Sequence, residues 1–156
     1  MEKVNTFLTF KEKGEEAVNF YVSLFKNSQI LSIVRSEGEG PIAKGALMHA
    51  RFRLDGQEFM AMDGGPYFSF AQGFSIFVSC DTQDEIDRLW NKLSEGGEEQ
   101  PCGWVLDKYG VSWQIVPPIL GDMLNDKDTD KSRRVLNAML QMKKIDIKAL
   151  QQAYEQ

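Results

Sequence analysis

Apolar residues recur along this chain at two spacings, one typical of helices and the other of strands. Stripes at i, i+3, i+4 and i+7 predict one helix over residues 15–25 and another that follows Thr82 and ends at Gly96-Gly97. Thr82, with Glu85 three residues later, forms a capping box at the start of the second helix. Alternating apolar and polar residues predict strands at 4–10, 29–35, 46–54, 57–62, 74–80, 104–106 and 111–116.

The predicted elements occur twice in the same order. Phe20-Tyr21 in the first helix and Leu89-Trp90 in the second lie 69 residues apart, as do Thr6 and Ser75 in the strands that precede them. The second half is shorter, mostly in its hairpin. We interpret this recurrence as a βαβββ module written twice, because internal repeats of this kind mark a repeated structural unit. The alternative is a chance likeness between two unrelated α+β halves.

The domain organisation follows from this repeat. We predict an α+β fold with a first βαβββ module over 1–66, a second, shortened module over 67–118 and a C-terminal helical extension over 119–156, all in one compact domain. The two curled mixed sheets are expected to surround a cup. In the extension, apolar spacing predicts a helix over 131–142 and another that starts after Asp146 as its N-cap. The residues of the first of these helices that we expect to face inward are Val135, Leu136, Met139 and Leu140.

Composition argues against two classes of partner. The 156 residues carry a formal charge of −5, whereas proteins that bind nucleic acid through its phosphates present a basic stripe. The sequence has no run of about 18 apolar residues, so no segment is predicted to span a membrane. The first residues lack the apolar stretch of a signal peptide, and two cysteines fit a reducing compartment. We therefore expect a cytoplasmic protein.

Several motifs resemble those of one known family. They are M-D-G-G-P at 62–66, F-S-I-F-V-S-C-D at 74–81, D-R-L-W at 87–90, C-G-W at 102–104, D-K-Y-G-V-S-W-Q-I-V-P at 107–117 and K-K-I-D-I-K-A-L-Q-Q-A-Y at 143–154. Together with the βαβββ repeat they resemble the PhnB-like branch of the vicinal-oxygen-chelate superfamily, which includes glyoxalase, bleomycin-resistance proteins and extradiol dioxygenases. PhnB-like proteins are often labelled demethylubiquinone methyltransferases. The likeness covers nearly the whole chain.

The methyltransferase label can be compared with the residues. Enzymes that use S-adenosylmethionine usually bind it at a glycine-rich turn from a strand to a helix in a doubly wound parallel sheet. Here the glycine pairs are Gly64-Gly65, in a linker, and Gly96-Gly97, after a helix. No glycine-rich turn opens a helix, so the sequence argues against methyl transfer.

The resemblance also implies positions for a metal. In the superfamily, His, Glu or Gln side chains from the first and last strands of each module hold a divalent ion in the cup. Carried over through the repeat, these positions are Thr6, Met60, Ser75 and Gln114, with Ala61 or Asp63 in place of Met60 after a shift of one residue. Hydroxyl, thioether and amide groups are weak ligands compared with imidazole and carboxylate.

The single histidine does not change this expectation. His49 lies in the hairpin strand before, where we interpret it as a surface or hydrogen-bonded residue. We therefore expect no metal and no cofactor, as in the bleomycin-resistance relatives that keep the cup but bind ligands without a metal.

The remaining cup residues predict a small-molecule pocket with aromatic walls, a few hydroxyls and one amide. Gln114 can both donate and accept, so it would orient a carbonyl or hydroxyl of a neutral or planar ligand. The alternative is that these polar groups satisfy one another through buried water. The predicted ligand-binding residues are Thr6, Leu8, Met60, Asp63, Ser75, Phe77, Trp104, Ser112 and Gln114.

Three functions remain open at this stage. The first is a metal-free small-molecule binding protein. The second is an isomerase, lyase or dioxygenase whose metal uses unusual ligands such as Gln114 with Asp63. The third is an interaction module whose C-terminal helices dock a partner. Asp63 and Asp107 are the only nearby acid–base candidates, and both lie at turns, where Asp usually caps backbone amides. We also expect a homodimer, because resembling proteins pair their modules across subunits and open sheets leave edges to be covered.

Overall fold

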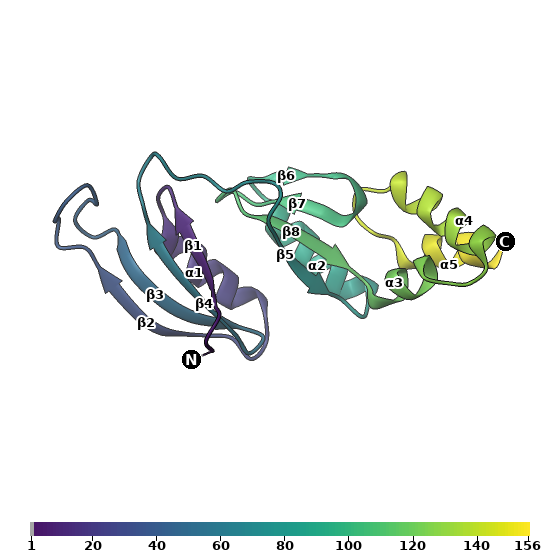
Figure 1. The fold of residues 1–156 in the computed structure, drawn as a ribbon, viewed down its shortest axis with the longest axis horizontal. Coiled ribbons are helices and arrows are strands. Elements are labelled where there is room, and N and C mark those ends of the chain that lie inside the picture. Colours follow the sequence, from purple (N-terminus) through teal and green to yellow (C-terminus); the bar gives the residue numbers. More distant parts are fainter. Residues whose placement is uncertain (1) are drawn as a thin grey trace. The chain divides into compact units, whose positions relative to one another are not determined.

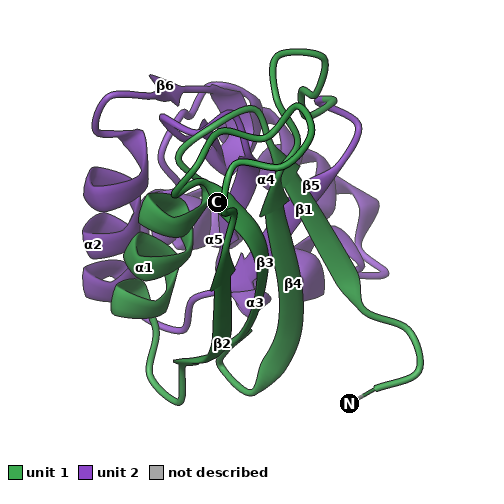
Figure 2. Cartoon of the chain, turned by 90° about the vertical axis from the view of Figure 1, so that its left-hand side faces the viewer, with its two compact units in different colours: residues 1–71 green, residues 72–156 purple. Residues whose placement is uncertain are grey.

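The computed structural model describes residues 2–156 and divides the chain into two compact units, residues 1–71 and 72–156 (Figure 2). Each unit contains a four-stranded mixed sheet with a helix packed on it (Figure 1). Within the described residues, no helix is both long and apolar enough to span a membrane.

The first unit is one βαβββ module. Its strand order is β1-β4-β3-β2, with β1 parallel to β4 and the other neighbours antiparallel. The tight Asp55-Gly56 turn joins β3 to β4, with φ values of 46° and 82° at its two residues. Such positive φ values are those that two-residue hairpin turns require, which is why Asp-Gly predicted this hairpin. The elements are β1 (Thr6–Phe10), α1 (Gly14–Leu24), β2 (Gln29–Arg35), β3 (Leu47–Leu54) and β4 (Gln57–Asp63).

The second unit repeats this topology. Its strand order is β5-β8-β7-β6, and β5 is parallel to β8, so the two sheets have the same connections. The sequence did not predict the two-residue strand β6, because two consecutive glutamates show no alternation. The elements are β5 (Ser75–Ser79), α2 (Gln83–Ser94), β6 (Glu98–Glu99), a 3₁₀ turn (Pro101–Gly103), β7 (Trp104–Leu106) and β8 (Ser112–Val116). The repeat of two βαβββ modules is therefore confirmed.

Each sheet buries one face against its helix. In the first unit, Ala17, Tyr21 and Leu24 of α1 are buried, and Phe52 and Phe59 of the sheet stack with ring centroids 5.5 Å apart. In the second unit the predicted stripe of α2 is buried completely or nearly so. Thr82 caps α2 by accepting a hydrogen bond from the backbone N–H of Glu85, as the capping box predicted. We call the sheet face that does not carry α1 or α2 the open face.

The C-terminal extension belongs to the second unit and has a small core of its own. It consists of α3 (Pro118–Leu124), α4 (Thr129–Leu140) and α5 (Ile147–Glu155). One part of the prediction for α4 is wrong: Val135 is buried, but Leu136 and Leu140 are 40% and 53% exposed. Because α4 packs on its neighbours through a narrower stripe than the sequence suggested, these two leucines face solvent. The buried core residues are Val116, Leu120, Met123, Val135, Ile145 and Leu150.

Candidate functional site: the open faces of the two sheets

Five of the predicted ligand-binding residues share the open face of the second sheet. The parallel register places Ser75 opposite Ser112 and Phe77 opposite Gln114, and the antiparallel register places Trp104 opposite Gln114. Residues opposite one another in a sheet project to the same side. The other side of β8 carries Trp113 and Ile115, both fully buried in the core.

The amide of Gln114 is partly satisfied within this face. Its Nε2 donates to the hydroxyl of Ser75 at 2.9 Å. Among the described residues the structure records no partner for the amide oxygen, so Gln114 can still accept a hydrogen bond. Phe77 lies next to this pair and is 56% exposed, whereas Ser112 is only 3% exposed. The face therefore offers an exposed ring beside an oriented amide.

In the first unit the predicted face is wrong for three residues. Leu8 is opposite Ala61, and both are buried to 1% exposure or less on the α1 side of the sheet. Thr6 and Asp63 lie on the same side as Leu8, because residues two positions apart along a strand share a face. Of the predicted residues in this unit, Met60 alone projects from the open face.

For Thr6 and Leu8 the cause is one extra residue between β1 and α1. Phe10 and Ala17 are the buried ends of this connection and lie 7 apart in number, whereas the matching Cys80 and Ile86 lie 6 apart. Lys13 just before α1 takes a left-handed φ of 61°, a conformation that lets the longer connection enter the helix. Strands β1 and β5 are therefore related by 70 residues, and helices α1 and α2 by 69. A shift of one residue moves every side chain of a strand to the other face.

With this shift, the open face of the first unit contains a different set of residues. Met60 of β4 is paired with Phe7 on the neighbouring strand β1 and with Arg51 on the neighbouring strand β3. The exposed Phe7, at 43%, is the counterpart of Phe77. His49 also belongs to this face, with its ring centroid 6.1 Å from that of Phe7. The alternation along β1 could have identified these residues, since Leu8 and Phe10 share one face and Phe7 and Thr9 the other. It would have done so if the positions had not been transferred from the second half through the repeat. On β1, β3 and β4 this face carries Phe7, Thr9, His49, Arg51, Arg53, Glu58, Met60 and Met62.

The two candidate acid–base residues are structural. Asp63 is 7% exposed and accepts hydrogen bonds from the backbone N–H groups of Gly14, at 2.8 Å, and Leu47, at 2.9 Å. It therefore caps α1, whose N-cap residue Lys13 makes no side-chain capping bond. A buried carboxylate that accepts two backbone bonds holds the strand and helix ends together.

Asp107 has the equivalent role in the last hairpin. It is 3% exposed, and its Oδ1 accepts from the backbone N–H groups of Tyr109 and Val111 at 2.8 and 3.0 Å. Its Oδ2 accepts from Nε1 of Trp113 at 2.8 Å. These bonds fix Trp113 in the core and leave Gln114, the next residue, on the open face.

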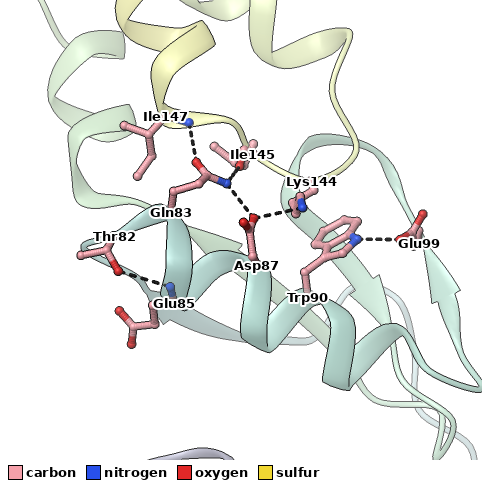
Figure 3. A network of polar contacts seen from close by, with 9 residues as sticks. All are labelled: Thr82, Gln83, Glu85, Asp87, Trp90, Glu99, Lys144, Ile145 and Ile147. Carbon is pink, nitrogen blue, oxygen red and sulfur yellow. Dashed lines mark hydrogen bonds and ion pairs between the residues drawn. The ribbon is translucent and has the colours of Figure 1, made fainter.

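A polar network ties the C-terminal extension to α2 (Figure 3). The side chain of Gln83 accepts from the backbone N–H of Ile147 at 2.8 Å and donates to the carbonyl of Ile145 at 2.9 Å. Lys144 Nζ lies 3.0 Å from Asp87 Oδ1. The hydrogen bonds from Gln83 and Lys144 lower the pKa of Asp87 below its ordinary value.

The same C-terminal segment holds the chain at the entry to β7. The backbone N–H groups of Cys102 and Gly103 donate to the carbonyls of Met142 and Lys143 at 2.9 and 2.8 Å. Both residues have left-handed φ values, 61° and 84°. The extension therefore stabilises the turn that places Trp104 on the open face.

The donor set does not fit a metal of the kind that the superfamily uses. Met60 and Gln114 occupy matching positions on β4 and β8, and a thioether and an amide oxygen are poor substitutes for imidazole or carboxylate. Across residues 2–156, no three His, Cys, Asp or Glu side chains come together as a possible metal site.

The glycine pairs also do not fit a nucleotide-type cofactor such as S-adenosylmethionine. A Cβ at Gly97 would lie 2.1 Å from the carbonyl oxygen of Leu106, and a Cβ at Gly64 would lie 2.5 Å from the Phe68 ring. Close packing within the protein therefore explains both glycines. Neither pair opens a helix that follows a strand.

The two cysteines are separate thiols, and one of them is chemically protected. Cys80 is fully buried, and burial raises the pKa of its thiol to about 12. A thiol with this pKa is almost entirely protonated at neutral pH and is a poor nucleophile.

Comparisons with known proteins agree with this architecture. A family model described as 3-demethylubiquinone-9 3-methyltransferase matches residues 2–116, which is the part of the chain that contains both βαβββ modules. The comparison with curated proteins gives no match. The extension α3–α5 lies beyond the matched residues.

Solved structures give the same result. The chain is 44% identical to a Bacillus cereus PhnB protein described as a 3-demethylubiquinone-9 3-methyltransferase, with a TM-score of 0.69, covering 74% of this chain and 99% of that one. A Pseudomonas aeruginosa protein is 26% identical, with a TM-score of 0.63 and coverage of 75% and 98%. The fosfomycin resistance protein FosX of Listeria monocytogenes, solved with manganese(II) and sulfate, is 13% identical, with a TM-score of 0.53 and coverage of 74% and 91%, and shares the fold. The chain therefore belongs to the PhnB-like family described as 3-demethylubiquinone-9 3-methyltransferase, within the vicinal-oxygen-chelate superfamily.

Proposed function

We propose that this protein binds a small, neutral, planar molecule on the open faces of its sheets, without a resident metal. The observation that carries the proposal is a matched pair of exposed aromatic rings. Phe7 and Phe77 occupy equivalent positions on β1 and β5, and are 43% and 56% exposed. A ligand that covers such a ring is stabilised by about 25 cal/mol for each Å² of apolar surface that its binding buries.

Polar groups beside Phe77 would fix the orientation of a bound ligand. Gln114 donates to Ser75, which leaves its amide oxygen free to accept and the Ser75 hydroxyl free to donate a hydrogen bond to a bound molecule. Trp104 lies across from Gln114 and supplies a second aromatic surface. A planar ligand that both stacks and hydrogen-bonds, such as an aromatic amide, satisfies these groups together.

Two other activities fit the residues less well. Methyl transfer would need a site for S-adenosylmethionine, and neither glycine pair forms a turn from a strand into a helix. An isomerase, lyase or dioxygenase with Gln114 and Asp63 as metal ligands would need Asp63 to leave the backbone N–H groups that it caps.

The proposal includes a cytoplasmic homodimer. Several large apolar side chains outside the strands are exposed, among them Val4 at 87% and Tyr67 at 97%. A dimer contact would cover such side chains, and contiguous apolar surface is characteristic of protein interfaces. Sedimentation velocity at micromolar concentration measures the mass, and a single species at 17.7 kDa would contradict the dimer.

Binding is tested with benzamide as the probe, by calorimetric titration and thermal shift. We expect saturable binding and a rise in Tm, since a ligand that binds only the folded state stabilises it. Gln114→Leu and Phe77→Ala should each weaken binding about tenfold, the equivalent of a lost hydrogen bond or a lost apolar contact of ~1.4 kcal/mol.

Matched controls distinguish these contacts from general effects. Phe74→Ala removes another ring of similar exposure, 47%, that precedes β5, and Gln152→Leu removes an exposed amide on α5. Both controls should bind benzamide like the unmodified protein. Equal affinity in Gln114→Leu and Gln152→Leu would exclude Gln114 from the site.

A further inference from the structure

A second candidate site lies at one end of the open face of the first sheet. A pocket of about 620 Å³ opens there between the start of β1 and the β3–β4 turn. This volume is within the range of small-molecule sites, roughly 300–1,000 Å³. Its lining residues include Asn5, Thr6, Arg53, Gln57 and Glu58.

Charged side chains meet at the wall of this pocket. Glu58 is a nearly buried carboxylate, with 4% of its side chain exposed. Its Oε1 accepts from Nε of Arg51 at 2.8 Å and lies 2.7 Å from Nη2 of the same residue. Two short contacts to one oxygen are a complete charge-assisted pair, so Arg51 and Glu58 neutralise each other.

Arg53, unlike Arg51, makes no close contact with Glu58. It lies opposite Glu58 on β3, but its Nη2 is 3.9 Å from Glu58 Oε2, which is longer than a hydrogen bond. Its side chain is 41% exposed and lines the pocket. A guanidinium has five N–H donors in a planar fork that matches a carboxylate or a phosphate. The one competing acid among the lining residues, besides Glu58, is the exposed Glu2.

We propose that this pocket binds the carboxylate or phosphate group of a small molecule, with Arg53 as the residue that pairs with the anion. The Arg51–Glu58 pair holds the neighbouring strands together, and the second carboxylate oxygen of Glu58, 3.9 Å from Nη2 of Arg53, keeps the Arg53 guanidinium beside the pocket. This inference extends the proposed small-molecule function, since it adds an anionic ligand class, but it depends on residues of the first unit alone.

The test compares three probes of similar size: benzoate, phenyl phosphate and the neutral benzamide. Calorimetric titration should show that one or both anions bind more tightly than benzamide, and that added salt weakens their binding. Which anion binds more tightly identifies the group. Arg53→Gln should weaken anion binding about tenfold, and Arg53→Lys, which keeps the charge but loses the fork, should lie between. Glu2→Gln should strengthen it by removing the competing carboxylate.

The matched control is Arg133→Gln, which removes an exposed arginine from α4 and should leave anion binding unchanged. Benzamide binding together with anion affinities that Arg53→Gln does not alter would overturn this inference and leave the proposed function in place. Anion binding that depends on Arg53, with no binding of benzamide, would uphold the inference and overturn the neutral ligand. Failure of all three probes would overturn both.

Discussion

The buried carboxylate of Asp107 provides the sharpest test of how the last hairpin is held. Asp107→Asn keeps the shape of the side chain and removes its charge. The amide oxygen can replace Oδ1 and still accept from the backbone N–H groups of Tyr109 and Val111. The amide NH₂ then faces Nε1–H of Trp113, where the carboxylate accepted a hydrogen bond at 2.8 Å.

The magnitude follows from this exchange. A hydrogen bond to a charged group contributes about 1.5–3 kcal/mol, and a buried donor left without an acceptor costs about 1–3 kcal/mol. Because Asp107 is only 3% exposed, water cannot easily replace the lost acceptor. We expect Asp107→Asn to lower the free energy of unfolding by about 2–4 kcal/mol.

A double-mutant cycle isolates the contact itself. Trp113→Phe removes the donor and keeps most of the apolar ring, so it costs about 2 kcal/mol alone. In the double variant no two donors face each other, so its loss should be smaller than the sum of the single losses by about 1–2 kcal/mol. Urea unfolding of the four proteins measures these differences.

Two results would refute this reasoning. Additive losses would show that Trp113 and Asp107 do not interact directly. A stable Asp107→Asn protein that had lost ligand binding would show that the carboxylate acts on the ligand and has no structural role. Benzamide titration of the folded variants, at a temperature well below their Tm, distinguishes the second case.

Three further predictions concern the second unit. Thr82→Ala removes the acceptor for the Glu85 N–H and should cost about 1 kcal/mol in urea unfolding, and an unchanged midpoint would show that the cap is not used. Gly97→Ala places a Cβ 2.1 Å from the Leu106 carbonyl and should lower Tm by several degrees, whereas Gly73→Ala, with open space around it, should not. Cys80, with its pKa raised to about 12 by burial, should resist a thiol reagent at pH 8 until urea unfolds the protein, and fast reaction in the native state would contradict its burial.

Most of the fold could be predicted from the sequence because its elements carry strong local signals. The apolar stripes of both helices and the alternation of the long strands appear where expected, and strand 29–35 has the predicted bounds. Asp63 and Asp107 cap backbone amides, which is the usual role of aspartate at turns. Local patterns sufficed there because the interactions involved are themselves local or set by periodicity.

The candidate site was harder to predict because it depends on which way each strand faces. In the second sheet the facing followed from alternation around Gln114. In the first sheet the positions were transferred through the 69-residue repeat of the helices, and the longer connection before α1 changed the facing of Thr6 and Leu8. Arg53 was missed because its significance depends on a distance, 3.9 Å to Glu58, that no sequence pattern records.

The longer connection before α1 has a practical consequence for protein engineering. To install a chelating set in this scaffold, metal ligands would be introduced at two cross-strand pairs that project outward. These are positions 7 and 60 in the first sheet and positions 77 and 114 in the second. A histidine introduced at position 8 would instead push an imidazole between the sheet and α1, where Leu8 is 1% exposed. Transferring ligand positions between the two halves by the 69-residue offset of the helices would thus place the metal ligand in the hydrophobic core.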